Sequence, residues 1–150
     1  MGQISILVVD DEKEIADLVE IYLVSDGYKV FKANNAQEGL EILDKEEIHL
    51  VLLDIMMPGM DGLEMCRRIR ETNNIPIIML SAKSTDLDKI LGLGTGADDY
   101  VVKPFSMAEL SAKIMSFLRR SKGLWEKKSS IEAYDIVIYP DRLQVFAAGN

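Results

Sequence analysis

Residues 49–62 read His-Leu-Val-Leu-Leu-Asp-Ile-Met-Met-Pro-Gly-Met-Asp-Gly. The leucines and the valine form a short apolar run, which predicts a β-strand that is buried on both faces. Asp54 follows this run, and the pairs Pro58-Gly59 and Asp61-Gly62 mark a turn-rich loop after it. The stretch therefore predicts a buried strand that delivers one carboxylate to the edge of a sheet.

Runs of the same kind recur along the chain, and segments of helical period separate them. The strand-like runs are residues 4–9, 28–33, 49–53, 76–80 and 100–102. The segments of helical period are residues 12–25, 36–45, 62–72, 86–93 and 107–120. Short strands joined by helices must be parallel, because each crossover helix returns the chain to the same end of the sheet. The sequence therefore predicts an α/β fold of five strand–helix units around a five-stranded parallel sheet.

Two local patterns add detail to the predicted helices. The first helix should present one apolar face, made of Ile15, Leu18, Val19 and Tyr22. Asn34-Asn35 precedes the second helix, and Ser106 is expected to be the N-cap of the last one. After residue 121 the composition changes: residues 122–130 are polar and basic, as in a linker, and residues 131–147 alternate as in a β-hairpin.

The composition limits the possible functions. The chain has 150 residues, 48% of them hydrophobic, and a formal net charge of −8. An acidic body repels phosphates, which argues against nucleic acid binding by that body. The single cysteine, Cys66, cannot form an intrachain disulfide, and the apolar run 4–9 is too short to span a membrane. We therefore expect a cytoplasmic domain with no membrane segment.

The polar residues that could bind a ligand or react lie at the predicted strand ends. In an open parallel sheet, ligands bind outside the carboxyl ends of the strands. The polar side chains at those ends are Asp10, Asp11, Glu12, Asp54, Ser81 and Lys103. Neighbouring carboxylates require a cation, and oxygen ligands favour a hard ion such as Mg²⁺. An ammonium and a hydroxyl suit the oxygens of a transferring phosphoryl group, and an aspartate can accept that group covalently.

This set of residues predicts Asp54 as the nucleophile, because Asp10 and Asp11 form a vicinal pair that is better placed to hold metal. Taken singly, each aspartate is more often a cap or turn residue; it is the combination at one edge that carries the prediction.

A phosphatase with an aspartyl nucleophile generally has a second aspartate two residues on as general acid, where this chain has Met56. A flavin-binding module is disfavoured by the acidic edge and the low aromatic content. We therefore expect no enzymatic turnover beyond slow self-dephosphorylation.

Four stretches closely resemble the receiver domains of bacterial two-component response regulators, in order and at that family's spacing. They are Val8-Val9-Asp10-Asp11-Glu12, residues 52–62, Leu80-Ser81-Ala82, and residues 96–105, which read Gly-Ala-Asp-Asp-Tyr-Val-Val-Lys-Pro-Phe. The resemblance covers about residues 3–120 and implies a flavodoxin-like fold. It implies that Asp54 is the phosphoacceptor and that Mg²⁺ is bound by Asp11, Asp54 and the backbone carbonyl of Met56, with Asp10 helping through water.

The resemblance also implies how the domain would signal. Lys103 would hold a phosphoryl oxygen, its bond to Pro104 would be cis, and Ser81 and Tyr100 would form the switch pair. The donor would be a sensor histidine kinase. The phosphorylated domain would form a homodimer through its fourth helix, fifth strand and fifth helix. The matching charged residues on that face are Lys89, Asp98, Asp99, Glu109, Lys113 and Arg120.

The last segment of the chain resembles part of a second domain. The stretch from residue 96 to residue 105, followed by a linker and a hairpin, is similar to the OmpR-type subfamily of transcription regulators. This resemblance implies a receiver domain at residues 1–121, a linker at 122–130, and the opening sheet of a winged-helix DNA-binding domain at 131–150. DNA binding would then belong to the parent protein, through the part of that domain beyond residue 150.

Overall fold

The computed structural model describes residues 3–82, 94 and 96–121. The predicted helix at 86–93, Lys89, the linker and the hairpin lie outside the described residues. The chain divides after Met115 into two compact units, and the following account of the sheet concerns the first unit.

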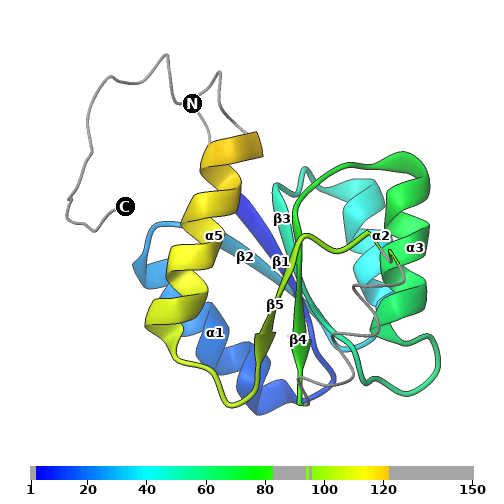
Figure 1. Ribbon diagram of the computed structural model, residues 1–150, viewed down its shortest axis with the longest axis horizontal. Coiled ribbons are helices and arrows are strands. Elements are labelled where there is room, and N and C mark those ends of the chain that lie inside the picture. The colour runs from blue at the N-terminus through cyan, green and yellow to red at the C-terminus, as the bar shows by residue number, and fades with distance from the viewer. Residues whose placement is uncertain (1–2, 83–93, 95, 122–150) are drawn as a thin grey trace. The chain divides into compact units, whose positions relative to one another are not determined.

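The first unit contains a five-stranded parallel sheet with helices on both faces, as predicted (Figure 1). The strand order is β2-β1-β3-β4-β5. The strands are β1 (Ser5–Val9), β2 (Lys29–Ala33), β3 (Leu50–Asp54), β4 (Ile77–Ser81) and β5 (Asp99–Val102). The helices in the described residues are α1 (Lys13–Ser25), α2 (Ala36–Lys45), α3 (Gly62–Thr72) and α5 (Met107–Ser121).

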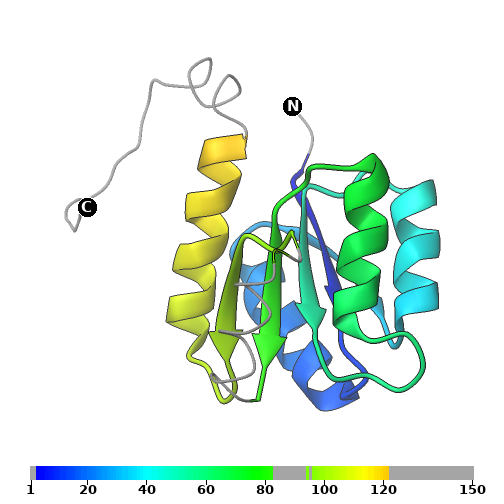
Figure 2. The same ribbon diagram turned by 45° about the vertical axis from the view of Figure 1, so that its right-hand side comes forward.

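The two layers of helices explain why the central strands are apolar on both faces. Figures 1 and 2 show α1 and the first part of α5 on one face of the sheet, with α2 and α3 on the other. Every residue of β1, β3 and β4 is buried, because side chains alternate between the two faces and both faces are covered. In the edge strand β2, by contrast, Ala33 is buried and the other four residues are exposed or half-buried.

The apolar face predicted for α1 is wrong in part. The helix buries Ala16, Val19 and Leu23, while the side chains of Leu18 and Tyr22 are about half exposed. Residues 16, 19 and 23 follow a helical stripe, and the small alanine lets the helix approach the sheet closely. Apolar residues occur almost all round this helix, so their spacing alone could not identify the buried side. Leu18, Ile21, Tyr22 and Val24 remain as exposed apolar side chains on α1.

Side chains cap the starts of three described helices. The side chain of Asn35 accepts a hydrogen bond from Glu38 N at the start of α2, and that of Asp61 accepts one from Glu64 N at the start of α3. The hydroxyl of Ser106 accepts one from Glu109 N before α5, as predicted. At the start of α1, the N-cap residue Glu12 makes no capping hydrogen bond with its side chain.

Two further features concern membrane-spanning helices and Cys66. Within the described ranges, no helix is long and apolar enough to cross a membrane. Cys66 is buried in α3, and burial raises the pKa of its thiol, so this side chain is part of the core.

Candidate functional site

The carboxyl ends of the central strands bring the predicted polar residues to one edge of the sheet. Asp10 directly follows β1, Asp54 ends β3, and Ser81 ends β4. Lys103 directly follows β5, and its backbone N donates a hydrogen bond to the carbonyl oxygen of Ser81 at 2.6 Å. The Lys103–Pro104 peptide bond is cis, as predicted. The parallel sheet thus gathers residues that lie far apart in the sequence.

The ammonium of Lys103 lies among three carboxylates. Its Nζ is 2.9 Å from Oε1 of Glu12, 3.2 Å from Oδ2 of Asp10 and 3.4 Å from Oδ1 of Asp54. The Lys103 side chain is only 13% exposed, whereas that of Glu12 is 60% exposed. One positive charge therefore faces three negative ones, two of which are buried.

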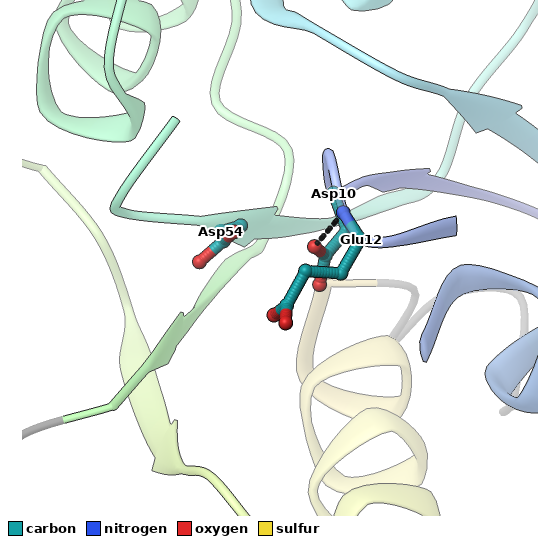
Figure 3. A group of neighbouring side chains, drawn as sticks. All are labelled: Asp10, Glu12 and Asp54. Carbon is teal, nitrogen blue, oxygen red and sulfur yellow. Dashed lines mark hydrogen bonds between the residues drawn. The ribbon is translucent and has the colours of Figure 1, made fainter. Parts of the chain in front are cut away.

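The carboxylates lie close enough together to hold a divalent cation. One oxygen each from Asp10, Glu12 and Asp54 lies within 4.8 Å of the others, and Figure 3 shows Asp10 and Glu12 extending the same way beside Asp54. Oδ1 of Asp10 accepts a hydrogen bond from Glu12 N at 2.9 Å. Oδ2 of Asp10 is buried and makes no hydrogen bond. Lys103 lies 3.2 Å from this oxygen, but the two buried carboxylates of Asp10 and Asp54 face a single ammonium, and this excess of buried negative charge fits a hard cation such as Mg²⁺.

The two remaining predicted metal ligands, Asp11 and Met56, each follow one of these aspartates in the sequence. Asp11 is exposed, and its side chain is one of the groups that raise the pKa of Asp54. Met56 follows β3 by two residues, and its side chain is 70% exposed. No role was predicted for Glu12, although a glutamate at an N-cap position, where shorter polar residues are preferred, is a usable signal.

The electrostatics of the site disfavour a charged Asp54 in the absence of metal. Burial, and next the negative charge of Asp10, raise the pKa of Asp54 to about 7, while Lys103 acts in the opposite direction. Burial alone would lower the pKa of Lys103, but the hydrogen bond to Glu12 and the charges of Asp10 and Asp54 raise it. A bound cation would therefore favour the ionised form of Asp54, which is the form that can act as a nucleophile.

The predicted switch residues lie on neighbouring strands. Ser81 is buried at the end of β4. Tyr100 on β5 is half-buried, is aligned with Met79, and packs against the core cluster that includes Met79. Because alternate residues of a strand share a face, Ser81 lies on the same face of the sheet as Met79 and Tyr100.

The charged residues predicted for a dimer face mostly have partners within the chain. Asp98 Oδ2 accepts hydrogen bonds from Arg70 and from the backbone N of Ile77, both at 2.8 Å. Asp99 forms an ion pair with Lys113 at 2.9 Å. Glu109 is exposed in the first turn of α5. In the second unit, the guanidinium of Arg120 lies 4.6 Å from the ring centroid of Phe117.

Comparisons with known proteins show which family this chain is similar to. Residues 6–115 match the family described as the response regulator receiver domain. The chain is 56% identical over 129 residues to the regulatory protein VanR of Enterococcus faecium. That match covers 84% of this chain and 56% of VanR, so the chain spans little more than half the length of that relative.

Solved structures show the same fold. A CheY-like response regulator receiver domain protein from Methanospirillum hungatei is 31% identical, with a TM-score of 0.76, over 82% of this chain and 99% of that one. The response regulator protein TrrA from Thermotoga maritima, in complex with Mg²⁺-BeF, is 38% identical. Its TM-score is 0.70, over 77% of this chain and 99% of TrrA.

Proposed function

The chain belongs to the family of response regulator receiver domains, and on that premise we propose that Asp54 accepts a phosphoryl group from a sensor histidine kinase in a Mg²⁺-dependent reaction. The observation that carries the proposal is the position of the Lys103 ammonium, 3.4 Å from the carboxylate of Asp54. This supports the proposal, because a positive charge next to Asp54 can stabilise the oxygens of an incoming phosphoryl group.

The proposed chemistry follows from the residues at the edge of the sheet. An oxygen of the ionised Asp54 carboxylate forms a bond to phosphorus, and the bond from phosphorus to the donor breaks with its electron pair leaving on the donor. Lys103 and Ser81 hold the oxygens of the transferred group. Asp10, Asp11, Asp54 and the carbonyl of Met56 would hold Mg²⁺. The bound ion would supply positive charge against the phosphoryl oxygens.

The surroundings of Asp54 favour a stable switch over rapid turnover. Met56, two residues after Asp54, has a side chain that cannot act as a general acid or base. We therefore expect self-dephosphorylation to be slow. Ser81 and Tyr100 would transmit the change, since they share a face of the sheet next to the site.

The output is proposed from the similarity to VanR and from the OmpR-type sequence pattern. Phosphorylation would favour a homodimer through the fourth helix, β5 and α5, and would regulate transcription through DNA binding by the parent protein. Residues 1–121 would be the receiver domain, 122–130 the linker and 131–150 the start of a winged-helix domain. The chain would act in the cytoplasm.

The phosphoacceptor role is tested with a small donor. We expect acetyl phosphate with Mg²⁺ to add one phosphoryl group to the chain, as read by intact-protein mass spectrometry. An excess of EDTA should remove this reaction, because the carboxylates then lose the cation that favours their ionised form. An unchanged mass with acetyl phosphate and with other donors would contradict the proposed function.

Metal binding is tested separately by thermal unfolding. Mg²⁺ at about one hundred times its dissociation constant should stabilise the fold by about 2.7 kcal/mol, because it binds the folded state only. Asp10→Asn should remove most of this gain, while Asp44→Asn, at an exposed carboxylate of α2, should keep it. Sodium chloride at matched ionic strength is the second control; an equal gain from sodium chloride would show that the effect is screening.

A further inference from the structure

The side chain of Glu12 does not cap its helix, unlike the side chains at the other described helix starts. It occupies the N-cap position of α1, where serine, threonine, aspartate and asparagine are preferred because their short side chains reach the first free backbone N–H groups. Asn35, Asp61 and Ser106 do so at the other helix starts. The Glu12 carboxylate instead accepts a hydrogen bond from Lys103 Nζ at 2.9 Å, across 91 positions of the chain.

Two other carboxylates also pair with Lys103. Asp10 and Asp54 are buried, and each has a carboxylate oxygen within 3.4 Å of the Lys103 ammonium. An ammonium has three N–H donors, and the shortest of the three ion pairs directs one of them to Glu12. Lys103 therefore has two further ion pairs besides the one with Glu12, and Glu12 occupies one of the donors of the ammonium.

Glu12 also places a negative charge near the reacting atoms. One of its carboxylate oxygens lies within 4.8 Å of an oxygen of Asp54. An incoming phosphoryl group is anionic, so this charge opposes its approach. Because the Glu12 side chain is 60% exposed, water can replace Lys103 as its partner when the two separate.

We propose that Glu12 is a positioning residue that slows phosphorylation, because its carboxylate engages the ammonium of Lys103 in the resting state and repels the incoming phosphoryl group. This inference rests on the proposed roles of Asp54 and Lys103. Glu12 thus sets how readily the resting domain is phosphorylated by small donors in the absence of a kinase.

The test compares Glu12→Gln with Glu14→Gln, which removes the same charge two residues away at an exposed position. With acetyl phosphate and Mg²⁺, the phosphorylation rate constant of Glu12→Gln should rise about three- to tenfold, the size expected for losing one nearby, partly screened charge. The rate constant of Glu14→Gln should stay within about twofold of the wild-type value, because charges in solvent are screened. In a Lys103→Ala background, Glu12→Gln should accelerate the reaction less than it does in the wild type.

A second measurement reads the contact without the reaction. The ¹H–¹⁵N signal of the Lys103 ammonium, assigned by its loss in Lys103→Ala, should shift in Glu12→Gln and stay in place in Glu14→Gln. The inference is overturned if Glu12→Gln is no faster than the wild type, if its acceleration is unchanged without Lys103, or if the Lys103 signal does not move. If the wild type and Glu14→Gln take up no phosphoryl group at all, the proposed function fails, and the ammonium signal still decides whether Glu12 holds Lys103.

Discussion

Replacing Asp54 by asparagine is expected to abolish phosphorylation completely. An amide of the same shape cannot attack phosphorus, and among the described residues no other carboxylate lies at the end of β3 beside Lys103. Intact-protein mass spectrometry with acetyl phosphate and Mg²⁺ is the measurement. Asp44→Asn serves as the matched control and should be phosphorylated like the wild type. If the Asp54→Asn variant is phosphorylated, another residue must be the acceptor.

The same substitution should stabilise the metal-free fold, to an extent that depends on pH. The folded-state pKa of Asp54, about 7, lies above its ordinary value of 3.8, so the folded state prefers the protonated form. The contribution of this carboxyl to stability is therefore complete below about pH 4 and is lost as pH rises through about 7. Asparagine does not titrate, so Asp54→Asn should match the wild type near pH 4 and exceed it by about 4 kcal/mol at pH 8.

Urea unfolding in EDTA across this pH range checks the stabilisation. Asp44→Asn, at an exposed carboxylate, should show no such growth with pH. A constant difference between Asp54→Asn and the wild type from pH 4 to pH 8 would mean that Asp54 ionises as easily in the folded state as in the unfolded one. The combination of lost phosphorylation and gained stability is typical of a side chain kept for function at a cost to the fold.

The topology of the site could be predicted because it depends only on strand order and strand ends. Parallel strands bring their carboxyl ends to one edge, so Asp54 and Lys103 were expected to meet, and they lie 3.4 Å apart. The cap at Ser106 was equally readable, since its preference is local to the sequence. Side-chain contacts that depend on tertiary packing could not be predicted from the sequence. The contact between Glu12 and Lys103 joins residues that no local pattern connects.

The reason why residue 62 is a glycine also could not be predicted from the sequence. The pair Asp61-Gly62 predicts a turn, in which glycine would be needed for its wide range of backbone angles. In the structure Gly62 is the first residue of α3, and its backbone N donates a hydrogen bond to Ile55 O at 2.9 Å. A Cβ atom built there would lie 2.8 Å from the Cα of Ile55 and would overlap the carbonyl oxygen of Asp54. The glycine is thus required because the helix start touches the backbone beneath it.

Gly62→Ala is therefore expected to lower the free energy of unfolding by about 2–4 kcal/mol. The atoms that a methyl group would meet belong to the backbone of β3 and the residue after it, which cannot rotate away, so α3 must shift. The shift should also displace Asp54 and slow its phosphorylation. Urea denaturation measures the first effect, and the rate with acetyl phosphate measures the second.

Gly39→Ala provides the control that separates this cause from the general effect of a methyl group in a buried helix. Its Cβ would lie 2.7 Å from Met65 Cε, the far end of a flexible side chain, and 3.0 Å from a methyl group of Val9. The methionine can adopt another rotamer, and alanine favours the helix by roughly 1 kcal/mol over glycine, so the loss should be smaller than at Gly62. Equal losses at the two positions would contradict the role given to backbone contact. A Gly62→Ala protein as stable as the wild type would show that the start of α3 can move away from β3 at no cost in stability.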